Sequence, residues 1–187
     1  MVLETDRLVL DQWRISDWIE LRPIATDAEV MLYITGGVPW VDDQIKSFVE
    51  HQVKLYVERG YCRRKLLAKP TLEMVSFCGL GLWRDAPDPE IGWWLARRYW
   101  GHGLATEVAR IVLQGAFERV RLNRIISITM SANTASIRIM EKLGLWFERE
   151  VERDGLCLLR YGIDRTQFIA SHDRRNFEPQ SNLRSRN

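Results

Sequence analysis

Apolar and polar positions along the 187-residue chain alternate first with the period of a strand and then with the period of helices. Residues 7–14 show the strand pattern, and Ser16 can cap a helix that begins directly afterwards. Two further helices are predicted to begin at Asp27 and Asp42, and the second of these ends at Gly60, a residue suited to a helix C-terminus. The chain is therefore expected to open with a strand followed by two or three helices.

The next part of the chain contains three runs that are rich in β-branched and apolar residues. They cover residues 61–69, 73–83 and 90–96, and turns at Pro70 and Pro87 separate them. Strands that follow one another through such short turns pair antiparallel. We therefore predict a three-stranded meander in the middle of the chain.

A helical period returns after this meander. Residues 104–120 place apolar side chains at i, i+3, i+4 and i+7 and polar side chains on the other face, which is typical of an amphipathic helix. Residues 125–130 form a β-branched run, and a second helix is predicted between Asn133, a good N-cap, and Gly144. The pattern thus indicates helix, strand and helix in this order.

Two final strands, residues 145–152 and 156–164, are predicted to form a hairpin around a glycine-containing turn. The element order indicates the α/β (α+β) class, with a mixed, mostly antiparallel central sheet of about seven strands and helices on both faces. One domain over residues 1–172 accounts for all these elements. Residues 173–187 are polar and arginine-rich, and we expect them to form a flexible tail.

Composition agrees with one globular domain, because 46% of the residues are hydrophobic and 28% are charged. The longest stretch without a charged residue, residues 125–137, is much shorter than the roughly 20 apolar residues of a membrane-spanning helix. The first residues lack the basic start and apolar segment of a signal peptide. Cys62, Cys78 and Cys157 are odd in number and widely spaced, so we expect no disulfide framework, no metal site and a cytoplasmic location.

The charges balance closely, with 27 Lys and Arg against 25 Asp and Glu. A nucleic-acid-binding protein usually carries a clustered basic face, which this sequence lacks outside its tail. We therefore expect neither a nucleic-acid nor a membrane partner. An edge strand within residues 145–164 leaves both a monomer and a homodimer open.

The most informative segment, residues 90–107, runs from a strand through a glycine-containing loop into a helix. Gly101 and Gly103 lack Cβ atoms, so the backbone can curl there and approach a ligand. The unpaired N–H groups and the positive end of the helix dipole favour an anion such as a pyrophosphate. Arg98 and His102 could add donors from their side chains.

Three other interpretations of this loop compete. A dinucleotide-binding fingerprint needs a third glycine where Thr106 stands, and a P-loop needs a Gly-Lys-Ser or Gly-Lys-Thr tripeptide that the sequence lacks. A structural turn is the ordinary explanation of two glycines alone. A nucleotide-binding domain that prefers NAD or ATP stays as a weaker alternative.

The motif Arg98-x-x-Gly101-x-Gly103, between a strand and an amphipathic helix, resembles the acyl-CoA pyrophosphate loop of the GNAT superfamily of N-acetyltransferases. The resemblance extends over roughly residues 2–168. It is strongest to the branch of ribosomal-protein N-terminal (alanine/serine) acetyltransferases and their small-molecule relatives. The segments that carry it besides the loop are ETDRLVL near the N-terminus, IGWWL before the loop, and NTAS and MEKLG after it.

The resemblance implies a GNAT fold, whose central sheet is splayed in the middle, and acetyl-CoA as cosubstrate. It implies that Asn133 binds the pantetheine arm through its side-chain amide, although a plain N-cap needs the same residue. The backbone of the strand before the loop would bind the pantetheine as an added strand does. The strand residues implied are Trp94, Leu95 and Ala96, and the pyrophosphate-loop residues are Arg98, Gly101, His102, Gly103, Leu104, Ala105 and Thr106.

The resemblance also implies catalytic residues. Ser136 corresponds to a hydroxyl that donates a proton to the departing thiolate, and its alternative is a surface serine. Glu90 corresponds to a general base that acts directly or through water, and its alternative is a residue that flanks the Pro89 turn. A base is needed because amines are mostly protonated at pH 7. A backbone N–H near Trp94 or Leu95 would stabilise the oxyanion.

The resulting expectation is direct transfer of an acetyl group from acetyl-CoA to a primary amine in a ternary complex, without a metal. The acceptor, a protein N-terminal α-amine or a small-molecule amine, stays open. Trp40, Trp83 and Trp100 could line an acceptor pocket, although aromatic residues are more often core. The alternative is a non-catalytic acyl-CoA-binding module, since fold does not guarantee activity.

Overall fold

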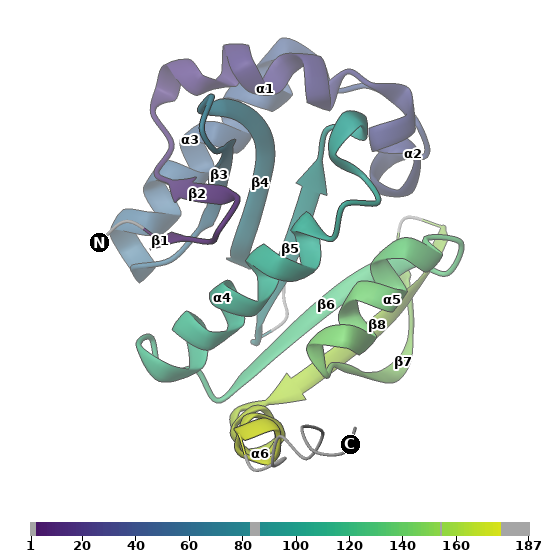
Figure 1. The fold of residues 1–187 in the computed structure, drawn as a ribbon. Coiled ribbons are helices and arrows are strands. Elements are labelled where there is room, and N and C mark those ends of the chain that lie inside the picture. Colours follow the sequence, from purple (N-terminus) through teal and green to yellow (C-terminus); the bar gives the residue numbers. More distant parts are fainter. Residues whose placement is uncertain (1–2, 83–86, 154, 177–187) are drawn as a thin grey trace, which may run out of the picture.

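The computed structural model of the chain describes residues 3–82, 87–153 and 155–176 (Figure 1). These residues form an eight-stranded sheet in the order β1-β2-β3-β4-β5-β6-β8-β7. Neighbouring strands pair antiparallel, except that β5 and β6 pair parallel. The strands are β1 (Leu3–Glu4), β2 (Leu8–Asp11), β3 (Arg63–Ala68), β4 (Glu73–Leu82), β5 (Pro89–Leu95), β6 (Arg124–Met130), β7 (Trp146–Arg153) and β8 (Leu156–Asp164).

Helices cover both faces of this sheet, as the sequence predicts (Figure 1). The amphipathic stripe of α4 packs, together with α5, against one face. Helices α1 and α3 enclose an aromatic-rich core on the other face. The helices are α1 (Trp18–Ala25), α2 (Ala28–Thr35), α3 (Asp42–Arg59), α4 (Leu104–Glu118), α5 (Thr134–Leu143) and α6 (Arg165–Asn176), and short 3-10 turns span Ile15–Asp17 and Arg97–Tyr99.

The two parallel strands in the middle of the sheet diverge. Strand β5 pairs with β4 over its whole length, but with β6 it shares one register pair, Glu90 with Ile126. Beyond Glu90 the outer edge of β5 is therefore not covered by β6, and the two strands separate toward their C-terminal ends (Figure 1). This confirms the mixed, mostly antiparallel sheet that is splayed in its middle.

Two features of the fold differ from the sequence expectation. The two-residue strand β1 adds an eighth strand, because Leu3 and Glu4 pair with Leu10 and Val9. Helix α6, which the pattern does not predict, packs Phe168 into the core against Phe117. It runs to Asn176, four residues into the predicted flexible tail, and residues 177–187 lie outside the described part of the chain.

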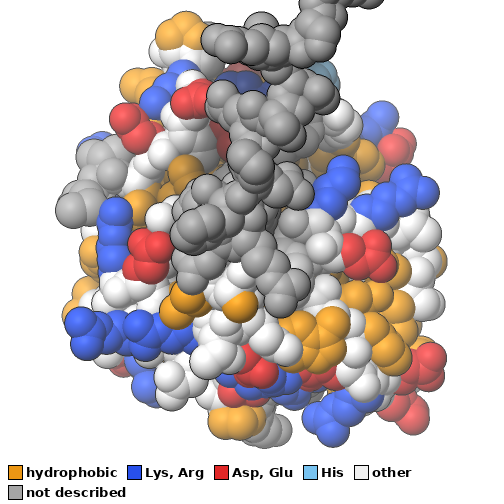
Figure 2. Space-filling model, turned by 60° about the horizontal axis from the view of Figure 1, so that its bottom comes forward, with side chains coloured by type: hydrophobic (Ala, Val, Ile, Leu, Met, Phe, Trp, Pro, Cys, Tyr) orange, Lys and Arg blue, Asp and Glu red, His pale blue; other side chains and the backbone are white. Residues whose placement is uncertain are grey.

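The surface carries charges of both signs side by side. Figure 2 shows basic and acidic side chains interspersed on the face that it presents. Within the described residues, no helix combines the length and the apolar character needed to cross a membrane.

Candidate active site

The loop between β5 and α4 owes its shape to two glycines. Gly101 and Gly103 have φ angles of 77° and 75°, in the left-handed region that favours glycine. A Cβ at Gly101 would meet no atom within 4 Å, so the backbone conformation, not crowding, requires the glycine. Gly103 is the N-cap of α4, whose first-turn N–H groups have no acceptor within the helix. This arrangement suits a pyrophosphate, and Leu104, Ala105 and Thr106 supply that first turn.

Arg7, which sequence reasoning did not single out, fastens this loop from the start of β2. Its Nη1 donates to the carbonyl oxygen of His102 at 2.9 Å, and its Nε donates to Oε2 of Glu107 at 2.8 Å. Burial alone would raise the pKa of Glu107, but hydrogen bonds from Thr5 and Arg7 outweigh it and the pKa is lowered. Arg7 lies within the ETDRLVL segment, which was the sole sequence signal for it.

Arg98 is engaged within the protein. Its guanidinium forms an ion pair with Glu73 at the start of β4 and lies over the Tyr99 ring, 5.0 Å from the centroid. The Tyr99 hydroxyl also donates to Glu73, at 3.0 Å. Arg97 pairs with Glu29 at 2.8 Å. Acidic partners thus offset both arginines, and the backbone N–H groups are the main feature of the loop that favours an anion.

The backbone groups of β5 alternate between its two neighbours. The buried Ser127 hydroxyl on β6 donates to the Ile91 carbonyl at 2.9 Å, so Ile91 faces the diverging side. By alternation the backbone N–H and C=O groups of Trp93 and Leu95 face this same side. Those of Trp94 face β4, where Trp94 pairs with Phe77. Of the implied strand residues, Leu95 therefore directs its N–H toward the splay and Trp94 does not.

Ala96 uses both of its backbone groups inside the protein. Its N–H donates to the Val75 carbonyl at 2.9 Å, and its own carbonyl accepts from the Tyr99 N–H at 2.9 Å. Trp100 donates its indole N–H to the Leu95 carbonyl at 2.7 Å, which places it beside the end of β5. Trp83 lies outside the described residues. Both backbone groups of Ala96 are thus engaged within the protein, and its role in cosubstrate binding stays a prediction.

Asn133 and Ser136 stand at the edge of the sheet where β5 and β6 end, because parallel strands direct their C-terminal ends to the same edge. Asn133 is the N-cap of α5, and its Oδ1 accepts from the Ser136 N–H at 3.1 Å. The cap occupies the acceptor oxygen, while an amide also has two N–H donors. Ser136 is half-buried in the first turn of α5. The glycine loop, Asn133 and Ser136 therefore share one edge.

Glu90 lies at the other end of β5, where the strand still pairs with β6. At an extended rise this is about 17 Å along the strand from Leu95. Glu90 is buried and receives a hydrogen bond from Arg63 Nη2 at 2.6 Å. Burial raises the pKa of Glu90 above its ordinary value, and the charges of Arg63 and Arg153 lower it only in part. A carboxyl group with a raised pKa is suited to accepting a proton near neutral pH.

Aromatic side chains line the same face of β5 as Glu90. Trp94 lies 4.8 Å from Trp40 and 4.8 Å from Phe77 between ring centroids, and its ring is stacked with Phe48 at 6.1 Å. Trp40, Phe48 and Trp94 are only partly buried. They form an aromatic wall on the side of α1 and α3, and Trp40 is the one predicted acceptor-pocket residue that belongs to it.

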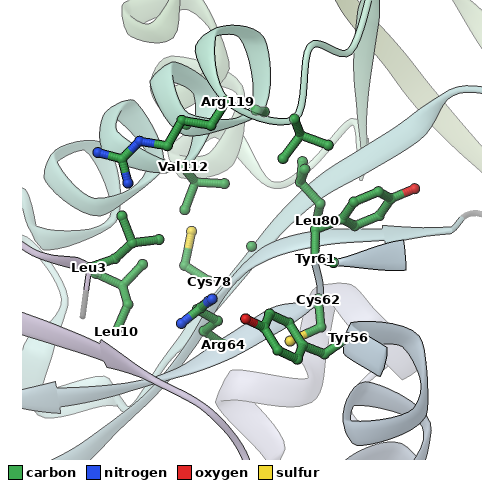
Figure 3. Close-up of a pocket in the computed structure, with 15 residues that line it drawn as sticks. Leu3, Leu10, Tyr56, Tyr61, Cys62, Arg64, Cys78, Leu80, Val112 and Arg119 are labelled. Carbon is green, nitrogen blue, oxygen red and sulfur yellow. The ribbon is translucent and has the colours of Figure 1, made fainter. Parts of the chain in front are cut away.

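A cavity of about 210 Å³ lies elsewhere, between the C-terminal half of α4 and strands β3 and β4 (Figure 3). None of the predicted site residues lines it. It is therefore separate from the loop and the splay. Its lining includes Leu3, Leu10, Tyr56, Tyr61, Cys62, Arg64, Cys78, Leu80, Val112 and Arg119.

A splayed parallel strand pair, followed by a double-glycine loop at a helix N-terminus, defines the acyl-CoA-dependent acyltransferase class. The family model for the GNAT acetyltransferase domain matches residues 7–145. The chain belongs to this family and is an N-acetyltransferase. Among the described residues, no group of three or more His, Cys, Asp or Glu could hold a metal ion.

Individual relatives agree with this assignment. The N-acetyltransferase p20 of Bacillus licheniformis is 29% identical over 150 residues, which cover 79% of this chain and 83% of p20. A GNAT-family acetyltransferase from Bacillus anthracis is similar in structure, with a TM-score of 0.75 and 24% identity over 89% of this chain and 99% of that one. The structure of RimL, a ribosomal L7/L12 alpha-N-protein acetyltransferase in complex with coenzyme A, is similar with a TM-score of 0.73 and 16% identity. The match covers 88% of this chain and 98% of the RimL chain. The two structural likenesses establish the shared fold.

Proposed function

We propose that the protein transfers an acetyl group from acetyl-CoA to a primary amine by direct attack within a ternary complex. The single observation that carries the proposal is the open edge of β5 beside the left-handed glycine loop. Both parts fit the cosubstrate, because the loop presents N–H groups to a pyrophosphate and the strand edge presents backbone groups to an amide-containing arm. Acetyl-CoA, when bound, supplies a thioester that an amine can attack.

The residues that hold the cosubstrate lie along one path. Gly101, His102 and Gly103 with the first turn of α4 bind the pyrophosphate, mainly through backbone N–H groups. The Leu95 N–H on the open side of β5 and the two N–H donors of the Asn133 amide at the start of α5 bind the pantetheine arm. Arg98 contributes less, because Glu73 already pairs with its guanidinium.

Three groups perform the proton and charge transfers. Glu90 accepts a proton from the acceptor ammonium through intervening water, since an amine must be neutral to attack and about 17 Å of strand separates Glu90 from Leu95. The Leu95 N–H, on the open edge of β5, stabilises the oxyanion. The Ser136 hydroxyl donates a proton to the departing thiolate.

The acceptor amine approaches from the side of α1 and α3. Glu90 and Trp94 point to that side of β5, and Trp40 extends the apolar wall there. An apolar wall beside a base suits either a small amine with an apolar body or the first residues of a protein chain. The three free cysteines, Cys62, Cys78 and Cys157, support a cytoplasmic location for the reaction.

Two measurements on the same sample test the function. Acetyl-CoA is titrated calorimetrically, and thiol release is then followed after adding pooled amines and pooled peptides. We expect Ser136→Ala to lower turnover by about 10²-fold or more while acetyl-CoA affinity is preserved. Ser131→Ala, an exposed serine in the turn before α5, is the matched control.

The outcomes separate the alternatives. Thiol release that falls in Ser136→Ala and not in Ser131→Ala supports the transferase with Ser136 as acid. Acetyl-CoA binding without thiol release for any acceptor identifies a binding module. A protein that does not bind acetyl-CoA at all contradicts the proposal.

A further inference from the structure

Arg63, at the start of β3, reaches across β4 to the base of β5. Its side chain occupies a slot that two glycines leave open. A Cβ at Gly81 would collide with the Arg63 guanidinium, and a Cβ at Gly92 would lie 3.2 Å from its Nε. Neither glycine has a left-handed φ, so backbone conformation does not require them. The glycines therefore make room for this arginine.

The backbone of Arg63 is held from two other elements. Its N–H donates to Oε1 of Gln52 on α3 at 3.0 Å, and its carbonyl accepts from the Trp13 indole N–H at 2.6 Å. Gln52 is 1% exposed and Trp13 is 6% exposed, so water competes little for either bond. Arg63 is thus fixed between the sheet and the helical cover of the acceptor side.

The slot leads the guanidinium to one group, the Glu90 carboxylate. Nη2 of Arg63 lies 2.6 Å from Oε2 of Glu90, and the two side chains are 17% and 11% exposed. Two other charged groups lie near Glu90. One is Arg153 on β7. The other is Asp88, two residues before Glu90 on the chain, which accepts a hydrogen bond from Arg160 at 3.1 Å. Asp88 thus already has a cationic partner, and Arg63 donates a hydrogen bond to Glu90.

We propose that Arg63 is a positioning residue that holds the Glu90 carboxylate ionised and directed toward the acceptor amine. The inference rests on the proposed role of Glu90 as base. A carboxylate removed from water protonates unless a cation or hydrogen-bond donor compensates. Burial already raises the pKa of Glu90, and Arg63 limits that rise. Without Arg63 the Glu90 carboxyl group would stay protonated to a higher pH, and in that form it could not accept a proton from the amine.

The pH dependence of kcat/KM tests the role of Arg63. In Arg63→Met the acid limb is expected to move upward by about one pH unit or more, because an opposite charge at this distance shifts a carboxyl pKa by that amount. Activity below the new limb falls about tenfold per pH unit, and activity well above it recovers. The acetyl-CoA affinity stays unchanged. A purely structural arginine would lower activity equally at every pH.

Arg64→Met is the matched control, since it removes the same charge one residue along the chain. The Arg64 side chain lies over the Tyr56 ring at 5.1 Å and lines the cavity of Figure 3, away from Glu90. Its acid limb should coincide with that of the unmodified protein. Arg63→Lys keeps the positive charge on a side chain of different length. The acid limb of its pH profile should therefore move upward by less than that of Arg63→Met.

Glu90→Gln separates failure of this inference from failure of the proposed function. If Glu90→Gln retains full activity, Glu90 is not the base and the function needs another one. If Glu90→Gln is inactive but Arg63→Met keeps the original acid limb, the positioning role of Arg63 is overturned alone. Should Arg63→Met fail to fold, Arg63→Gln, which keeps a polar side chain without the charge, decides the question, and an acid limb identical to that of the unmodified protein overturns the inference.

Discussion

Replacing Arg7 with Met is expected to weaken acetyl-CoA binding, although Arg7 lies about a hundred residues from the loop along the chain. The substitution removes the hydrogen bond from Nη1 to the His102 carbonyl and the ion pair with Glu107. Methionine keeps most of the apolar stem, so packing around β2 should persist. The loop then loses its hydrogen bond to Arg7. It populates several conformations in the free protein, and only one of them binds acetyl-CoA.

The exposure of the partners limits the size of the effect. The Arg7 and Glu107 side chains are 50% and 24% exposed, so the ion pair itself contributes about 0.5 kcal/mol. A hydrogen bond from a charged donor contributes more, about 1.5 kcal/mol at the lower end, and partial exposure of Arg7 reduces it to about 1 kcal/mol. Together these terms allow an increase in Kd of up to about tenfold.

Calorimetric titration with acetyl-CoA measures this change. Arg22→Met is the control, because Arg22 pairs with Asp42 at 2.6 Å with similar exposure, 56% and 43%, between α1 and α3. It should leave the Kd unchanged. Because salt screens exposed charges, the Kd values of the Arg7→Met variant and the unmodified protein should differ less at 1 M salt.

Two results would refute this reasoning. The first is an Arg7→Met variant whose Kd for acetyl-CoA equals that of Arg22→Met, since the contacts of Arg7 with His102 and Glu107 would then not support the loop. The second is a loss of several hundredfold, because the contacts of Arg7 cannot supply that much free energy.

Two further predictions concern stability and thiol chemistry. Lys65→Met should lower the free energy of unfolding by about 3–5 kcal/mol in urea titrations, because it leaves the buried Asp17 carboxylate without its partner at 2.8 Å; an unchanged midpoint would contradict this. Burial raises the pKa of Cys62 to about 11 and of Cys78 to about 12, so at pH 8 a thiol reagent should modify Cys157 alone until urea is added; rapid reaction of a second thiol in the folded protein would be inconsistent with that burial.

Local patterns predicted most of the fold. The apolar stripe of α4 and the N-cap Asn133 depend on residues within a few positions of one another, and both are confirmed. The loop glycines are likewise local, because Gly101 and Gly103 adopt the left-handed conformation that the motif needs. Helix α6 escaped prediction because its anchor, Phe168, packs against a residue of α4.

The sequence alone could not show which strand residues direct their backbone groups toward the splay. It named Trp94, Leu95 and Ala96 together, yet neighbouring residues of a strand direct their backbone groups to opposite sides. Which of them face the splay depends on the register of β5 with β4 and β6, and a shift by one residue would exchange them. That register is a tertiary property.

The sequence by itself determined most of the elements and the position of the glycine loop, because glycines, caps and amphipathic periods act through neighbouring residues. The class of protein followed from the resemblance of the loop and its neighbouring segments to the GNAT superfamily. The tertiary structure decided the partners of the charged groups. Arg7 meets His102 because the loop before α4 lies near the start of β2, and Arg63 meets Glu90 because β3 and β5 flank β4 in the sheet. The protonation of Glu90 is a tertiary property as well, since burial and an opposing charge both arise from folding.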